Sequence, residues 1–114
     1  MNLPFIAASA IMLTIHAYGS YLGFRLRTFS RAVGPYIAAY ESAYYIFAVA
    51  QLWRVLGLLL PLIALMLIIH VVGAYLYIRG YLGQYANGAL LRYYAAFELF
   101  EFSIILALTI SALP

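Results

Sequence analysis

The chain contains no cysteine, no lysine and no aspartate, and it has few charged residues of any kind. Without cysteine, there can be no disulfides, thiolate metal sites or cysteine nucleophiles. Only 8% of the 114 residues are charged and 68% are hydrophobic, so polar groups are too few to cover the surface of a water-soluble domain. We therefore expect the protein to lie in lipid or in a very apolar assembly.

The motifs of familiar enzyme classes are also missing. The sequence has no Gly-rich phosphate loop, no Gly-x-Ser-x-Gly turn and no His-Glu-x-x-His pair. Without aspartate it also lacks a Ser-His-Asp set. The net charge of +3 comes from scattered arginines, so direct nucleic-acid binding is not expected. The sequence predicts a non-enzymatic protein.

Long apolar runs are what the chain does have, and residues 55–78 form the most complete one. This run is uncharged and is bounded by Arg54 and Arg79. A membrane-spanning helix needs about 20 apolar residues to cover about 30 Å of hydrocarbon. Pro61 and His70 interrupt the run. A membrane helix tolerates proline where neighbours satisfy the freed carbonyl, whereas an intramembrane histidine needs a polar partner.

The sequence predicts a single all-α domain over residues 1–114, with four apolar helices as the favoured form. The helices are expected at about 3–24, 36–53, 55–78 and 92–113, with a basic loop at 25–35 and a glycine-rich loop at 80–91. No polar turn separates the second and third runs. A three-helix form therefore stays open, in which residues 36–79 make one helix of about 65 Å at about 1.5 Å per residue. Such a helix exceeds a bilayer and would suit a protein filament.

The arginines predict the orientation of the four-helix form. The first and third connections would carry all of them except Arg54, which falls in the second. The positive-inside rule then puts those two connections in the cytoplasm and both termini outside. Every arginine is expected at an interface, where it can meet lipid headgroups: Arg25, Arg27, Arg31, Arg54, Arg79 and Arg92.

Five ionisable side chains are expected at one depth below that cytoplasmic face. Counting from the helix ends at about 1.5 Å per residue places them roughly 8 to 14 Å inside the apolar region. They are His16, Glu41, His70, Glu98 and Glu101. Charged groups inside a membrane usually face the bundle and pair with one another, so the sequence predicts a polar layer that links all four helices.

A small-residue pair in the first run predicts close helix packing. Gly19 and Gly23 lie one turn apart, and small residues at this spacing let another helix backbone approach closely. We expect this pair to lie at a helix interface.

The polar layer has several interpretations. In the first it is structural, with hydrogen bonds fixing helix register and no cofactor. In the second, His16 and His70 ligate a haem b from its two faces, or the layer forms a quinone site. In a third, Glu41 or Glu98 titrates in a small proton-coupled transporter. A non-haem metal site is not expected, because the usual pattern has Glu-x-x-His on one helix and this chain has Glu98-x-x-Glu101.

The apolar runs on either side of 80–92, the scarcity of polar surface and the turnless stretch 36–79 resemble the hydrophobic pilins of conjugation-type DNA-transfer systems. The resemblance covers the chain from about residue 36 onward and implies self-assembly, together with lipid, into a hollow extracellular filament. Arg54 or the loop arginines would then meet lipid headgroups lining the lumen. Length and helix count also resemble the small multidrug resistance transporters, which carry a glutamate in the first helix where this chain has His16.

The favoured function is structural: an integral membrane subunit that packs with copies of itself or with partner subunits, and with lipid. The alternatives are the pilin and an anchor subunit of a respiratory complex holding haem b or a quinone. Arg54 separates these classes, because a bilayer protein needs it at a water-exposed turn whereas a filament can keep the helix running through it.

Overall fold

The computed structural model describes residues 2–81 and 87–113, and these residues form four α-helices. The helices are α1 (Leu3–Phe24), α2 (Gly34–Leu52), α3 (Leu60–Ile78) and α4 (Gly88–Ser111), with a short 3₁₀ helix, η1 (Gly57–Leu59), before α3. No strand occurs among the described residues. The predicted all-α, four-helix class is confirmed, and the single long helix over 36–79 is not formed.

The reversal between α2 and α3 is short and, apart from the buried Leu56, exposed. Gly57 has a positive φ of 49°, and Pro61 lies in the first turn of α3. Glycine adopts this left-handed conformation without the steric cost of a side chain, and proline fits a first turn because the N–H there has no partner within the helix. The third helix therefore begins at Leu60, later than the predicted 55–78, and Arg54 lies exposed in the turn.

Asparagine residues cap the first and last helices. The side chains of Asn2 and Asn87 each accept a hydrogen bond from a backbone N–H of the first turn, at 3.2 and 2.9 Å. The cap at Asn87 lets α4 begin at Gly88, before the start near residue 92 that its apolar run predicted. Of the predicted glycine-rich loop, residues 82–86 lie outside the described part of the chain.

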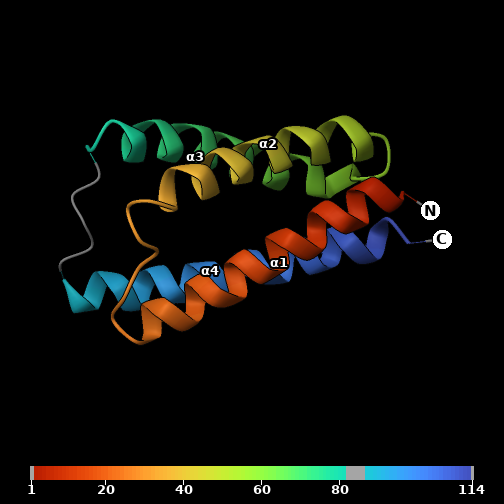
Figure 1. Ribbon diagram of the computed structural model, residues 1–114. Coiled ribbons are helices and arrows are strands. Elements are labelled where there is room, and N and C mark those ends of the chain that lie inside the picture. Colours follow the sequence, from red (N-terminus) through yellow and green to blue (C-terminus); the bar gives the residue numbers. More distant parts are fainter. Residues whose placement is uncertain (1, 82–86, 114) are drawn as a thin grey trace.

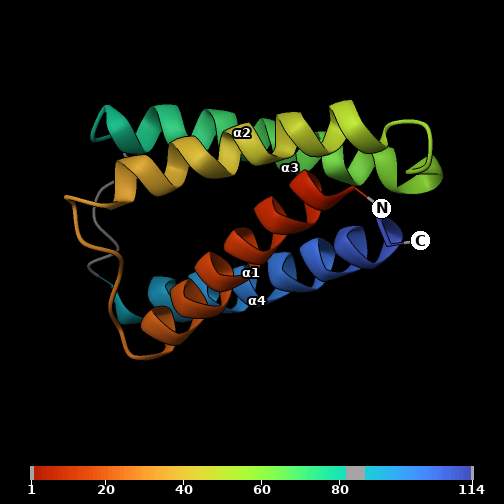
Figure 2. The same ribbon diagram turned by 45° about the vertical axis from the view of Figure 1, so that its right-hand side comes forward.

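The four helices form two antiparallel pairs (Figures 1 and 2). Helix α1 packs chiefly against α4, and α2 chiefly against α3, with a shorter contact between α1 and α2. Both termini and the α2–α3 reversal lie at one end, which we call the terminal end, and the α1–α2 connection lies at the other. The two pairs converge at the terminal end and separate towards the opposite end, which we call the wide end.

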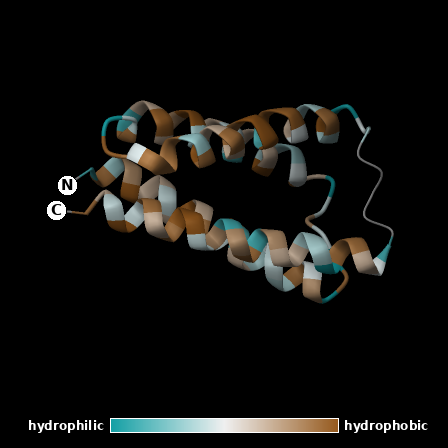
Figure 3. Cartoon of the chain, turned by 180° about the vertical axis from the view of Figure 1, so that it is seen from behind, coloured by the Kyte–Doolittle hydropathy of each residue, from teal (hydrophilic) through white to brown (hydrophobic). Residues whose placement is uncertain are grey.

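Three helical segments are long and apolar enough to cross a membrane: Leu3–Phe24, Gly57–Ile78 and Gly88–Ser111. Helix α2 is less hydrophobic because it carries Glu41, Gln51 and several tyrosines. It is as long as α3, at 19 residues, and lies beside it. The longest dimension is 42 Å, which matches a bilayer with its headgroups, about 40 to 45 Å thick. These are the features of an integral membrane protein, and Figure 3 shows helices that are mainly hydrophobic with hydrophilic colour at the turns.

The hydrophobic core contains residues of all four helices and of the α2–α3 turn. It is formed by Phe5, Met12, Tyr44, Tyr45, Ala48, Leu52, Leu56, Ile63, Met66, Ile105 and Leu108. Most of these residues belong to the helix halves that meet at the terminal end. Apolar packing therefore closes that end, while the interior nearer the wide end is left to polar side chains and a cavity.

Candidate functional site

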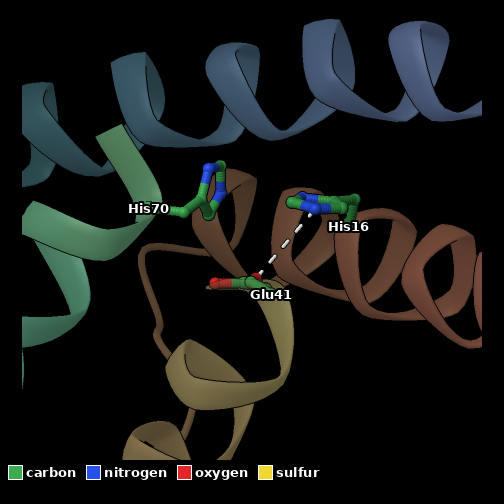
Figure 4. Close-up of side chains that lie close together, drawn as sticks. All are labelled: His16, Glu41 and His70. Carbon is green, nitrogen blue, oxygen red and sulfur yellow. Dashed lines mark ion pairs between the residues drawn. The ribbon is translucent and has the colours of Figure 1, made fainter. Parts of the chain in front are cut away.

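Five ionisable side chains from all four helices meet in the interior. His16 lies on α1, Glu41 on α2, His70 on α3, and Glu98 and Glu101 on α4. Figure 4 shows three of them converging from three helices. The structure thus brings together the residues that the sequence assigned to one polar layer, and we call this group the His–Glu cluster.

His16 is fully buried at the centre of the cluster. Its Nδ1 lies 2.5 Å from Glu98 Oε2 and 3.7 Å from Glu101 Oε2. The shorter contact is a charge-assisted hydrogen bond, in which the imidazole N–H donates to the carboxylate. The other ring nitrogen, Nε2, lies 4.0 Å from Glu41 Oε1 and finds no hydrogen-bond partner among the described residues.

His70 is bonded at both ring nitrogens. Its Nδ1–H donates to the backbone carbonyl of Met66 at 2.8 Å, and since a carbonyl only accepts, this nitrogen carries a proton. Its Nε2 lies 3.2 Å from Glu101 Oε1, which also accepts a hydrogen bond from the Tyr45 hydroxyl at 3.2 Å. Glu101 therefore joins α4 to both α2 and α3.

Small residues on α1 allow α4 to come close enough for these contacts. A Cβ on Gly19 would lie 3.0 Å from Glu98 Oε2, and a Cβ on Gly23 would lie 2.8 Å from the Cβ of Ala95. The pair Gly19 and Gly23 thus lies at the α1–α4 interface. Without side chains at these positions, Glu98 can reach His16 across the interface.

A half-open cavity of about 470 Å³, which we call the cleft, lies against the cluster between the two helix pairs. Four cluster residues line it: Glu41, His70, Glu98 and Glu101. The rest of its lining comes from the α1–α2 connection and from α2, α3 and α4: Thr28, Phe29, Arg31, Gly34, Ile37, Ala38, Ile69, Gly73, Ala74, Tyr77, Tyr94 and Phe97. The cluster is therefore reached from a cavity rather than sealed inside the core.

The arginines are all exposed, at the two ends of the molecule. Arg25, Arg27, Arg31, Arg79 and Arg92 lie towards the wide end, and Arg31 also lines the cleft. Arg54 lies at the terminal end, where its guanidinium is 5.1 Å from the centre of the Trp53 ring. This geometry is a cation–π contact at an interface. Contact of the arginines with lipid headgroups stays a prediction.

The two histidines lie as a perpendicular pair, with ring centres 6.3 Å apart. His70 uses both of its nitrogens, and His16 uses Nδ1 for Glu98. Iron ligation by both rings would require His70 to leave Glu101. The haem b alternative therefore stays a prediction, and it needs a rearrangement of this pair.

Sequence analysis did not single out Tyr45 or the Met66 carbonyl. Helical spacing was the signal for both, because Tyr45 follows Glu41 by four residues on α2 and Met66 precedes His70 by four on α3. The cleft left no such signal, because it depends on which helices pair. A scan of protein-family models and searches of curated proteins and solved structures find no match to this chain.

Proposed function

We propose that the chain is a small, non-enzymatic subunit of a membrane assembly, which packs with copies of itself, with other membrane helices and with lipid. The apolar outward surface of the helices carries this proposal, and α3 provides the clearest case. Only three of its residues are buried, all on one face. On the opposite side Leu65, Ile68 and Val72 are 51%, 60% and 50% exposed. In a bilayer this surface meets lipid or another helix.

The polar side chains support the same proposal. The histidines and glutamates of the chain all turn inward and, apart from Glu41, form close hydrogen bonds or ion pairs there. Exposed arginines lie at the helix ends and connections rather than on a soluble face. With water absent, helix association in membranes depends on close packing and on such internal hydrogen bonds. The described chain is thus built as a packing unit.

A respiratory anchor subunit is the second candidate, and the cleft favours it. Ligand pockets for small molecules usually have volumes of about 300 to 1,000 Å³, with mostly apolar walls and a few polar groups. The cleft has this character, and His70, which lines it, offers to a quinone oxygen the Nε2–H that contacts Glu101 in this structure. The pilin alternative has less support, because Arg54 lies at an exposed turn and not within a continuous helix.

Cysteine cross-linking tests the proposed assembly, since the chain has no native cysteine. We expect Ile68→Cys, on the outward face of α3, to form a disulfide-linked dimer in native membranes. Ile11→Cys, on α1, is a second test position, because the native residue is 52% exposed, close to the 60% of Ile68, but lies on the other helix pair. A chain that forms no disulfide at either position, and that is purified from its membrane as a monomer without other membrane proteins, contradicts the proposal.

A further inference from the structure

Two imidazoles and one carboxylate point towards one place beside the cleft. One ligand atom from each of His16, Glu41 and His70 lies within 4.8 Å of the others. Figure 4 shows these three side chains arriving from three different helices. Nitrogen and oxygen donors are therefore gathered around a common point.

The unpartnered nitrogen of His16 is the second, independent observation. Its Nε2 is buried, finds no hydrogen bond among the described residues, and lies 4.0 Å from Glu41 Oε1. A buried polar atom without a partner costs free energy comparable to its full desolvation, so native structures seldom leave one. A cation between His16 and Glu41 would satisfy both groups at once.

The hydrogen bonds of the two histidines also suit a metal ligand. The Nδ1 of His16 is held by Glu98, and the Nδ1 of His70 by the Met66 carbonyl. Ligating histidines almost always donate their second N–H to a carboxylate or a backbone carbonyl, which fixes the ring and leaves the other nitrogen free to bind the metal. The Nε2 of His16 is thus free to act as a ligand, and the Nε2 of His70 becomes one when the ion replaces its contact with Glu101.

We infer that the His–Glu cluster binds a divalent first-row transition metal ion, with His16, Glu41 and His70 as ligands. Tetrahedral ligands at about 2.0 to 2.1 Å from zinc lie about 3.4 Å apart, so the side chains close by roughly an ångström around the ion. Imidazole and carboxylate donors without a thiolate suit zinc, iron(II) or manganese(II) rather than copper(I).

The cleft supplies the route for the ion. Of the three ligands, Glu41 and His70 have the most accessible side chains, at 15% and 9%, and both line the cleft. The exposed arginines nearby do not prevent entry, because the carboxylates at the cluster outnumber Arg31, the arginine that lines the cleft. Metal binding here would also fasten α1, α2 and α3 together.

The composition simplifies the test, because the sequence has few metal-binding side chains outside the cluster. Both histidines and all three acidic side chains of the full sequence belong to the cluster, and there is no cysteine. The chain is purified in detergent with an affinity tag that contains no histidine, and is then stripped with a chelator. We expect Zn²⁺ to raise its thermal unfolding midpoint by about 5 °C or more at saturation. Co²⁺ should give a visible absorption band.

Glu41→Gln is the decisive variant. The side chain of Glu41 takes no part in the hydrogen bonds of the described residues, so the variant should unfold near the wild-type temperature in chelator. It should nevertheless lose the Zn²⁺ shift and the Co²⁺ band. Tyr44→Phe is the matched control on α2, because it removes a buried hydrogen bond to Ser9 outside the cluster and should keep both signals.

Glu98→Gln gives a graded readout, because it keeps the three ligands and weakens only the support of His16. We expect zinc affinity to fall by about 10- to 100-fold. The inference is overturned if folded wild-type protein shows neither a Zn²⁺ shift nor a Co²⁺ band. It is also overturned if folded Glu41→Gln responds as the wild type does.

Discussion

Among the described residues, His16 has one short hydrogen bond, to Glu98, and both side chains are buried. Glu98→Gln replaces a charge-assisted bond with a neutral one, and charge-assisted bonds are roughly twice as strong. We predict a loss of about 1 to 2 kcal/mol in the free energy of unfolding. The measurement is denaturant unfolding in detergent, in the presence of a chelator.

Ser103→Ala is the control for this variant. Ser103 is exposed on the same helix, and within the described part of the chain its hydroxyl donates only to the Leu99 carbonyl of the preceding turn. Its removal should leave stability nearly unchanged. Equal stabilities of Glu98→Gln and wild type would mean that the charge of Glu98 adds nothing to the bond between α1 and α4.

At this scale the sequence could predict which side chains meet but not how they bond. Intramembrane depth is set by position along a helix, so the sequence assigned His16, Glu41 and His70 to one layer. The pairing depends on helix rotation and on which helices are neighbours. Nothing in the sequence indicates that Glu101 bonds His70 while Glu98 takes His16. The unpartnered Nε2 of His16, and with it the proposed metal site, follow only from that arrangement.

Close contact between α1 and α4 rests on glycine, and this can be tested at the scale of the element. A Cβ on Gly23 would lie 2.8 Å from the Cβ of Ala95 and 3.0 Å from the Leu91 carbonyl oxygen, which is backbone and cannot move aside. We predict that Gly23→Ala forces the helices apart and costs about 1 to 3 kcal/mol. The thermal midpoint in detergent is the measurement.

Gly73→Ala is the matched glycine control. Gly73 is in the interior of α3, and a Cβ there meets nothing within 4 Å. Alanine is the better helix former by about 1 kcal/mol, so this variant should be neutral or stabilising. If Gly73→Ala loses as much stability as Gly23→Ala, the loss does not come from the packing of α1 on α4, because a Cβ at Gly73 meets nothing there.

Helix existence followed from the sequence more readily than helix ends did. The apolar runs fixed four elements, and α1 runs from Leu3 to Phe24 as the sequence indicated. The ends that differ have local causes, the Asn87 cap for α4 and the Gly57 reversal for α3. Such turns have little polar character in this chain, so hydropathy alone gives them weak signals. Pairing of α1 with α4, the most distant helices in the chain, left no signal at all.

The molecule as a whole has two unlike ends, and this allows a test of its orientation. Both termini and Arg54 lie at the terminal end, while the α1–α2 connection with its arginines lies at the wide end. The positive-inside rule puts the wide end in the cytoplasm. We therefore predict that Val55→Cys reacts with a membrane-impermeant maleimide in intact cells, whereas Ser30→Cys reacts only after lysis.

The two positions are matched in the ways that matter for labelling. Both are exposed, both lie in turns outside the α-helices, and the sequence offers no other thiol to react. Labelling of both on one side of the membrane would contradict an odd number of crossings between them, and so the membrane placement of α2. Labelling in the reverse pattern would keep the four crossings but invert them, and the cleft with its route to the His–Glu cluster would then open away from the cytoplasm. The labelling experiment therefore also determines from which side of the membrane a metal ion would reach His16 and Glu41.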